Sequence, residues 1–223
     1  LPDPSAFVMK VMGLLKHGDH DIKHEPSDPR KGPKGKIPWI VDGGRTIADS
    51  TFIQRYLEDT YGIDFYAGLD ERDKAIGWAV EKMCEDHLYF CAVHERWAKD
   101  ENFQKGPRIF FDMVPAVMRP LVVAMVRRQI VGNVKGQGIG LHNDAEIAEL
   151  AARDFDALAA LLGDKTYFFG DRLTATDAVV HAFVASALTP FFEGPLRDAA
   201  LAHDNLVAYA ARLDDQWYGD AKS

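Results

Sequence analysis

Residues 35–62 read GKIPWIVDGGRTIADSTFIQRYLEDTYG, and this stretch decides the fold. Its apolar run at 37–41 is rich in β-forming residues and predicts a mostly buried strand. Gly43 and Gly44 then predict a hairpin turn, because primed turns need positive φ at both central residues. Residues 45–48 would form the returning strand.

A helix is predicted directly after the hairpin. Asp49 or Ser50 can cap its start, and Thr51 to Gln54 fits a capping box. Apolar residues then recur at helical spacing, and a glycine stands where a helix commonly ends: Phe52, Ile53, Tyr56, Leu57 and Gly62. The unit is therefore strand, tight turn, strand and helix.

Two places in this unit can carry chemistry. Pro38 heads the first strand and cannot donate a ladder hydrogen bond, so it marks a special backbone site, with a cis bond as one option. The helix start at Ser50 offers N–H groups and a positive dipole end, which attract an anion. A peptide ligand would fit with its backbone against Ile37 and Pro38 and its carboxylate at Ser50. The alternative is a strand-edge proline beside an ordinary helix cap.

Composition excludes several classes of protein. The 223 residues are 47% hydrophobic and 27% charged, with a net charge of −8, which argues against a nucleic-acid partner. Two cysteines, Cys84 and Cys91, form no disulfide framework and suit a reducing compartment, so we expect a cytoplasmic protein. The most apolar long window, 109–126, contains Asp112 and Arg119, and it predicts a buried helix and not a membrane span.

The rest of the chain is predicted to be mainly helical. Before the hairpin, a helix starts near Asp3 and Pro4, residues 20–24 form a short strand, and residues 25–36 form a loop. After the hairpin we expect a linker at 63–70, one long helix at 71–100 and a second helix at 107–131 that is kinked at Pro115 and Pro120. A glycine-rich loop at 134–141 leads to a third helix, from Asn143 or Asp144 to Gly163. A buried helix then starts at the Thr174 to Asp177 cap, and two short helices follow near 196–203 and 206–218.

This order of elements resembles the glutathione transferase superfamily. The resemblance implies an α/β plus all-α fold: a thioredoxin-like domain over 1–62, a linker over 63–70 and an all-helical domain over 71–223. The thioredoxin-like fold begins with an interior strand that this sequence does not contain. We therefore expect a strand to precede Leu1 in the native protein.

Three stretches narrow the resemblance to the failed-axon-connections branch, which is related to the metaxins. They are LPDPSAFVMKVMGLLK at 1–16, CEDHLYFCAVHERW at 84–97 and VKGQGIGLHNDAEI at 134–147. Metaxins associate with the mitochondrial outer membrane. We recognise no membrane-anchoring tail in this sequence and do not carry that property over.

The resemblance implies a glutathione site built on residues 35–62. Ile37 and Pro38 would pair with the cysteinyl backbone of glutathione. Asp49 would bind its ammonium group, and Ser50 would bind the γ-glutamyl carboxylate through its hydroxyl and N–H. Lys36 would reach the glycyl carboxylate, with a solvated loop lysine as the alternative.

The activating residue implied by the resemblance is Ser5, which matches a Ser-Pro-Phe pattern at the start of the first helix. Its hydroxyl would donate to the glutathione sulfur and stabilise the thiolate, as a helix start also does. Ala6 replaces the expected proline, and the negative charge of Asp3 would oppose a thiolate. The alternative role of Ser5 is to satisfy backbone groups in the first turn.

A stripe of four residues along the long helix suggests a metal site at first sight: Cys84, His87, Cys91 and His94. The ten residues that it spans extend about 15 Å at about 1.5 Å each, so one ion cannot meet all four. We therefore predict no metal and a packed helix face. The resemblance implies that this helix borders the electrophile pocket, which His87, His94 or Trp97 could line.

The leading hypothesis is thus a glutathione transferase-like enzyme with glutathione as co-substrate and a small electrophile as substrate. A homodimer is expected from the resemblance alone. The alternative is a non-catalytic module that keeps the fold and binds a partner protein, which the departures at Asp3 and Ala6 favour.

Overall fold

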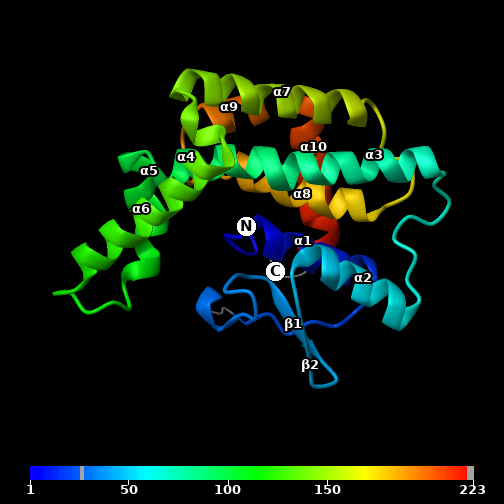
Figure 1. Ribbon diagram of the computed structural model, residues 1–223. Coiled ribbons are helices and arrows are strands. Elements are labelled where there is room, and N and C mark those ends of the chain that lie inside the picture. Colours follow the sequence, from blue (N-terminus) through cyan, green and yellow to red (C-terminus); the bar gives the residue numbers. More distant parts are fainter. Residues whose placement is uncertain (26–27, 220–223) are drawn as a thin grey trace. The chain divides into compact units, whose positions relative to one another are not determined.

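The computed structural model describes residues 1–25 and 28–219. The chain forms two compact units. The first unit comprises Leu1–Glu81, Leu162–Ser186 and the residues from Ala208 onward, and the second comprises Lys82–Leu161 and Ala187–Val207. Figure 1 labels the elements.

The first unit contains the predicted hairpin. Strands β1 (Trp39–Asp42) and β2 (Arg45–Ala48) are antiparallel, with Trp39 opposite Ala48, and they make up the whole sheet of residues 1–25 and 28–219. Gly43 and Gly44 have φ of 53° and 79°, as a primed turn requires. The strand expected before Leu1 stays a prediction.

Helix α2 (Ser50–Tyr61) follows the hairpin, as the sequence predicts. Asp49 is its N-cap, and the Asp49 side chain accepts a hydrogen bond from the Thr51 N–H at 3.1 Å. Gly62 ends the helix in the left-handed conformation, with φ of 67°. The inward face is buried, with Ile53 0% and Leu57 2% exposed. Local signals therefore set both ends of α2.

The start of the chain differs from the prediction. Helix α1 (Ala6–His17) is capped by Ser5 and not by Asp3, because the Ser5 Oγ accepts from the Val8 N–H. The short strand predicted at 20–24 is wrong, since these residues have no regular structure. In the predicted loop, residues 29–31 form a 3₁₀ turn, and residues 26–27 lie outside the described residues.

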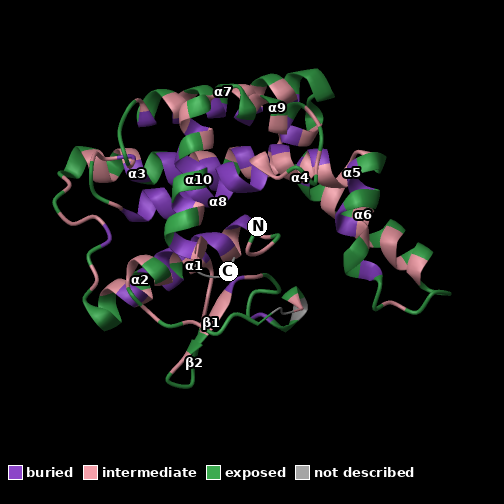
Figure 2. Cartoon of the chain, turned by 180° about the vertical axis from the view of Figure 1, so that it is seen from behind, coloured by how far each residue is buried: buried purple, intermediate pink, exposed green. Residues whose placement is uncertain are grey.

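A helical core completes the first unit. Helix α8 (Ala175–Leu188) is buried from Ala175 to Ala187, as its apolar sequence predicts (Figure 2). The predicted cap is present, because Asp177 Oδ2 accepts from both the N–H and the Oγ of Thr174 at 2.8 Å. Helix α10 (Asp204–Tyr218) supplies Tyr209, whose hydroxyl donates to Asp177 Oδ1 at 3.0 Å.

The predicted long helix is helical from Glu71 to Trp97 without a break. It consists of α3 (Glu71–Lys82), a π-helical stretch over Met83–Leu88 and α4 (Tyr89–Trp97). The prediction to residue 100 is three residues too long, and α5 (Asp100–Lys105) is a separate helix. Two further helices of the second unit are α7 (Asp144–Leu162) and α9 (Pro195–Leu201). Asn143 caps α7, since its Oδ1 accepts from the Ala145 N–H.

The helix predicted over 107–131 is present only from residue 119 onward, and the burial predicted for 109–126 is wrong. Residues 107–111 form a 3₁₀ helix, residues 112–118 contain Pro115 and do not form an α-helix, and α6 (Arg119–Gln137) starts with Pro120 in its first turn. Proline is tolerated in a first turn but not inside a helix, so the break falls before Pro120. The loop predicted at 134–141 is also shorter than expected, because α6 runs through Gly136 and a 3₁₀ turn follows at Ile139–Leu141.

In the part of the chain that the structure describes, no helix is both long and apolar enough to cross a bilayer. The predicted domain limits at residues 62 and 71 stay predictions.

Candidate functional site

The first unit brings the two halves of the predicted ligand site together. The Ile37–Pro38 bond is cis, and Pro38 is buried. The carbonyl oxygen of Pro38 accepts a hydrogen bond from the Asp49 N–H at 3.2 Å. The head of β1 and the start of α2 are therefore joined directly, although ten residues lie between Pro38 and Asp49 in the sequence.

The backbone at Asp49 has an unusual conformation. Its φ of 84° and ψ of 128° lie outside the regions that residues with a Cβ usually adopt. Such a backbone persists where the surroundings determine it, and it is common at functional sites. Here it turns the chain from β2 into α2 and places Ser50, which is 4% exposed, in the first turn. The N-terminal turn of a helix attracts anions.

A lysine that the sequence analysis did not single out, Lys34, lies beside this turn. The Nζ of Lys34 lies 3.6 Å from Asp49 Oδ2 and 4.6 Å from the centre of the Phe52 ring. Lys36 is exposed. Sequence reasoning missed Lys34, because its position depends on how the loop after residue 28 folds, and no periodic pattern reports that.

Ser5 lies at the start of α1, where the prediction places it. Its Oγ accepts from the Val8 N–H at 3.4 Å, and a hydroxyl that accepts in this way keeps its own hydrogen for another acceptor. Asp3 Oδ1 accepts from the Ser5 N–H at 2.7 Å, while Asp3 Oδ2 lies 3.1 Å from His24 Nε2. The Asp3 carboxylate, expected to oppose a thiolate, thus has partners of its own. No sequence pattern indicates the contact between Asp3 and His24.

A buried ion pair connects α1 to α3 behind the start of α2. Lys10 Nζ lies 3.1 Å from Glu81 Oε1, and the two residues are 0% and 2% exposed. The Thr51 hydroxyl donates to the same oxygen at 3.2 Å. Removing one partner of such a pair costs about 3–5 kcal/mol, because a charge is left buried. This pair therefore fixes the first turn of α2 relative to α1 and α3.

An open pocket of about 250 Å³ begins at the residue after Ser50. Its walls come from α2, α3 and the segment between them: Thr51, Gln54, Arg55, Glu58, Tyr66, Lys74, Trp78 and Glu81. Burial raises the pKa of Tyr66 to about 12, so its hydroxyl stays protonated and can donate. Positively charged side chains, negatively charged side chains and the indole of Trp78 thus line the pocket.

The side chains predicted to border an electrophile pocket are engaged in packing within the second unit. His87 Nδ1 lies 2.6 Å from Asp154 Oδ2, and burial raises the pKa of Asp154. The ring of Trp97 packs against Phe103 and Phe111, with centroids 5.8 and 6.4 Å away. That these residues line an electrophile pocket stays a prediction.

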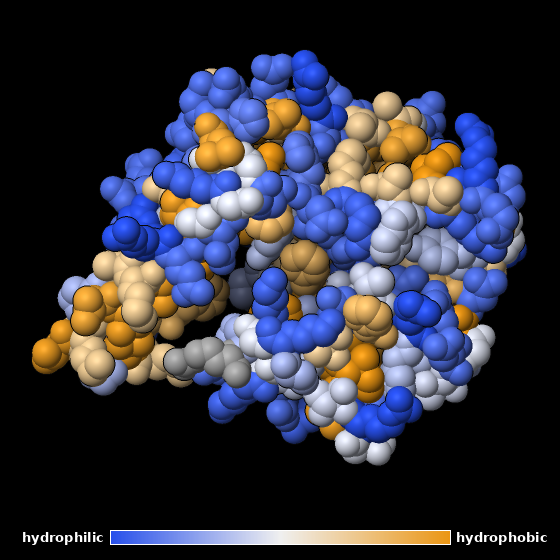
Figure 3. Space-filling model, in the orientation of Figure 1, coloured by the Kyte–Doolittle hydropathy of each residue, from blue (hydrophilic) through white to orange (hydrophobic). Residues whose placement is uncertain are grey.

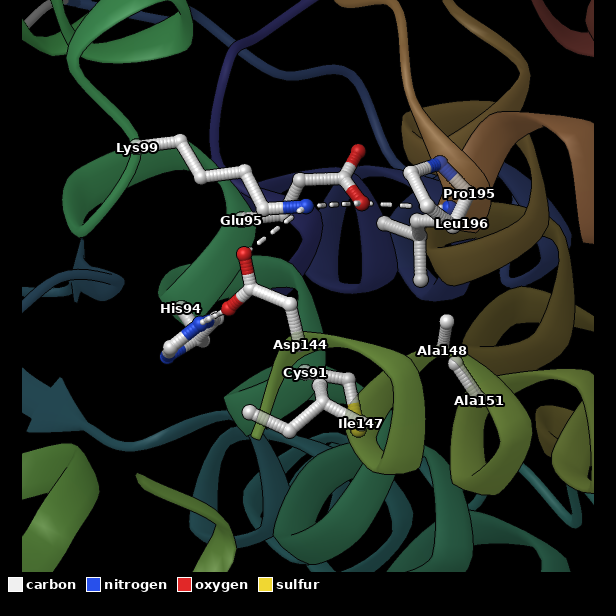
Figure 4. A pocket seen from close by; sticks show the side chains of 10 residues that line it. All are labelled: Cys91, His94, Glu95, Lys99, Asp144, Ile147, Ala148, Ala151, Pro195 and Leu196. Carbon is white, nitrogen blue, oxygen red and sulfur yellow. Dashed lines mark hydrogen bonds and ion pairs between the residues drawn. The ribbon is translucent and has the colours of Figure 1, made fainter. Parts of the chain in front are cut away.

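His94 lies at a small cavity between α4, α7 and α9 (Figure 4). Its Nε2 is 2.9 Å from Asp144 Oδ1, and Lys99 reaches towards Asp144 and Glu95. The cavity volume is about 10 Å³, which is close to the room that one water needs. Burial raises the pKa of Cys91, on its wall, to about 12, so this thiol stays protonated near neutral pH. Within residues 1–25 and 28–219, no three His, Cys, Asp or Glu side chains are placed to hold a metal ion.

Two family models match the chain. The model of the glutathione S-transferase N-terminal domain matches residues 6–102, and that of the glutathione S-transferase C-terminal domain matches residues 151–213. Together they cover most of the chain.

Curated relatives agree with these matches. Isoprene-epoxide–glutathione S-transferase of Rhodococcus sp. is 29% identical over 97% of this chain and 94% of its own length. Failed axon connections of Drosophila melanogaster is 28% identical over 99% of this chain, and the chain spans only 56% of that protein. Mouse metaxin-1 is 22% identical over 96% of this chain and 70% of its own length.

Solved structures share the fold. The beta-etherase LigF of Sphingobium sp. has a TM-score of 0.66 at 16% identity, covering 97% of this chain and 96% of its own. A glutathione S-transferase of Methylobacterium radiotolerans in complex with glutathione sulfonate has a TM-score of 0.60 at 18% identity, covering 97% and 90%. The predicted fold class, a thioredoxin-like domain followed by a helical domain, is confirmed. The chain belongs to the glutathione S-transferase superfamily, in the branch of Failed axon connections and the metaxins.

Proposed function

We propose that the first unit binds glutathione along the cis Ile37–Pro38 edge and the start of α2, and that the protein conjugates the bound glutathione, through its sulfur, to a small electrophile. One observation carries this proposal: the 3.2 Å hydrogen bond from the Asp49 N–H to the Pro38 carbonyl. It places an edge for a peptide backbone beside a helix start that suits a carboxylate.

In this proposal each end of glutathione has its own partner. The cysteinyl backbone pairs with Ile37 and Pro38. The γ-glutamyl carboxylate binds at Ser50 in the first turn of α2, and its ammonium group binds the Asp49 carboxylate. Lys36 is the candidate for the glycyl carboxylate, and it is exposed on the loop before the cis bond.

The proposed chemistry needs no group beyond glutathione. The Ser5 hydroxyl donates to the sulfur, which lowers the thiol pKa, and the thiol proton leaves to water. The thiolate then attacks an electrophilic carbon and forms a C–S bond. Either a leaving group departs, or an epoxide C–O bond breaks and the released oxygen takes up a proton. The Rhodococcus relative, named for isoprene epoxide, makes a small epoxide the first substrate to test.

A calorimetric titration with reduced glutathione tests the binding site. Ser50→Ala removes one charge-assisted hydrogen bond, so we expect a loss of about 1.5–3 kcal/mol, roughly ten- to a hundredfold in affinity. Thr60→Ala is the matched control, because it removes an exposed hydroxyl from the other end of the same helix. Equal affinity in wild type and Ser50→Ala would remove Ser50 from the site.

Turnover of an epoxide tests the role of Ser5 separately. We expect Ser5→Ala to lower kcat at least a hundredfold while glutathione affinity changes little, because the hydroxyl acts on the sulfur. The Oγ also caps α1, so the melting temperature of the variant must be compared with that of wild type. Unchanged turnover in a folded Ser5→Ala protein would contradict the mechanism and leave binding intact.

The second candidate function is a module that keeps the fold to bind a partner protein. It is favoured by the indole of Trp78, which is 54% exposed at the mouth of the 250 Å³ pocket. Large exposed aromatic side chains are typical anchors of protein interfaces. No heat and no thermal shift at millimolar glutathione would support this candidate over the first. A homodimer and a cytoplasmic location remain predictions, which light scattering and cell fractionation would check.

A further inference from the structure

The second unit exposes a concentration of large apolar side chains on residues 107–137, which we call the arm. Of the sixteen large apolar side chains that are exposed in the described part of the chain, seven lie on the arm, each 56–94% exposed: Ile109, Phe110, Met113, Val117, Met118, Leu121 and Met125. Figure 3 shows apolar atoms gathered in the region of α6 and the segment before it. Single exposed apolar residues are normal, but a contiguous group of this kind marks an interaction surface.

The outer side of α6 continues this surface as a stripe. Leu121, Met125, Arg128, Gly132 and Lys135 follow each other at steps of four and three residues, which places them on one helix face, and all five are exposed. The stripe is apolar at its start and basic further along. An apolar patch thus merges into a cationic one.

The opposite side of α6 is anchored within the second unit. The guanidinium of Arg127 donates to the carbonyl oxygens of Trp97 and Ala98 at 2.7 Å and stacks 4.6 Å from the Phe103 ring. Val134, near the end of α6, is 2% exposed. The stripe is therefore presented by a helix that α4 and α5 hold in place.

The arm is basic, in contrast to the whole protein. It contains five Lys or Arg residues and one acid, Asp112, whereas the chain has a net charge of −8. Arg108 and Arg119 share that acid, at 3.5 and 3.6 Å, and Arg127 pairs with Asp100 at 2.6 Å. Arg128 and Lys135, the two cations of the outer stripe, are exposed.

We propose that the arm docks on an anionic lipid surface. Its apolar side chains would enter the boundary between headgroups and acyl chains, and the two cations of the stripe would meet lipid phosphates and carboxylates. A second copy fits less well, because its own copy of the stripe carries the same basic residues and offers no opposite charge to Arg128 and Lys135. This surface belongs to the second unit and the proposed glutathione site to the first, and the inference does not rest on the proposed function.

Co-sedimentation with vesicles tests the inference. We expect the protein to bind vesicles of phosphatidylcholine with 30% phosphatidylserine, to bind pure phosphatidylcholine at least tenfold more weakly, and to lose affinity as salt is raised. No binding to the anionic vesicles at 1 mM lipid would overturn the inference. So would equal binding to both kinds of vesicle, since it would leave the cations without a role.

Two variants separate the apolar contribution from the charge contribution. The triple variant Met113→Asp, Val117→Asp, Leu121→Asp should abolish binding, whereas Val41→Asp, at a 67% exposed position of β1, should not change it. The double variant Arg128→Gln, Lys135→Gln should weaken binding to anionic vesicles about thirtyfold, at about fivefold for each cation. Arg153→Gln, Lys165→Gln removes the same charge from two exposed positions outside the arm and should change affinity less than threefold.

A probe at Val117 keeps the test independent of those variants. Cys84 and Cys91 are 0% and 1% exposed, so a thiol-reactive NBD label can be placed on Val117→Cys. Anionic vesicles should blue-shift and brighten this label, and they should leave the same label on Val41→Cys unchanged. An unchanged Val117 label would overturn the inference. Light scattering that shows a dimer dispersed by the triple variant, without vesicle binding, would assign the arm to a second copy instead.

Discussion

Helices α2 and α6 both carry apolar residues at helical spacing, but they place them in different surroundings. In α2, Leu57 is 2% exposed and faces the core of the first unit. In α6, Leu121 is 71% exposed on the outer stripe. The spacing of apolar residues thus indicates which face of a helix they share. Whether that face is covered depends on the rest of the molecule.

The same substitution at these two leucines should have the largest and most unequal effects. Leu57→Ala leaves a cavity among buried side chains, so we expect a loss of about 2–5 kcal/mol of unfolding free energy. Leu121→Ala removes side-chain atoms that are mostly in water, so the change should stay within about 0.5 kcal/mol. Urea unfolding followed by circular dichroism measures both.

Equal losses in these two variants would break the comparison. A large loss for Leu121→Ala would mean that the outer stripe is covered in solution, for example by a second copy. In that case the midpoint of Leu121→Ala, but not that of Leu57→Ala, should return towards the wild-type value on dilution, because dissociation removes the cover from wild type as well.

Residues 35–62 were predictable because their signals act locally. Gly43 and Gly44 permit the hairpin turn, Asp49 caps α2, and Gly62 ends it, each through groups only a few residues away. The arm instead contains many apolar residues, and whether such residues are buried depends on which other parts of the molecule cover them. The sequence therefore predicted a helix over 107–131 with a buried stretch at 109–126, where the structure has a 3₁₀ turn, a non-helical segment and an exposed helix.

The candidate site divides in the same way. The positions of Pro38, Asp49 and Ser50 were predictable, because the strand start and the helix start lie on either side of one hairpin. The partners from outside the hairpin were not: Lys34 reaches Asp49 from a loop, and His24 reaches Asp3. Contacts of this kind depend on the path of irregular segments, and such segments have no repeating sequence pattern from which their path could be predicted.

Two glycines give a second, smaller contrast between the regions. Gly43 has φ of 53°, and an added Cβ would meet no atom within 4 Å, so Gly43→Ala should cost about 1–2 kcal/mol through backbone strain alone. Gly132 lies inside α6, where a Cβ would also meet no atom, so Gly132→Ala should gain about 0.5–1 kcal/mol. Thermal unfolding should give shifts of opposite sign. A loss at Gly132 would show that something closely covers that side of α6 in solution.

The smallest effects should come from two carboxylates with opposite pH dependence. Hydrogen bonds from Tyr61 and Tyr56 lower the pKa of Asp42 in the hairpin, whereas burial raises the pKa of Glu95 in α4. A lowered pKa favours the folded state above the usual value near 4, and this stability is lost as pH falls through the folded pKa. A raised pKa has the reverse effect, because the folded state binds the proton more tightly, so stability falls as pH rises from about 4 through the folded pKa.

Asp42→Asn and Glu95→Gln each remove one of these titrations. The unfolding free energy of wild type minus that of Asp42→Asn should decrease as pH falls below about 4. The unfolding free energy of wild type minus that of Glu95→Gln should increase as pH falls from 7 towards 4. Urea midpoints of the three proteins between pH 3.5 and 7.5 measure both trends. The Glu95 carboxylate also accepts from the Leu196 N–H at 3.1 Å, a bond that Gln can keep through its carbonyl oxygen, so the variant isolates the charge. A pH-independent difference for Glu95→Gln would mean that water reaches this carboxylate, and that the packing between α4 and α9 is looser than the first unit's core.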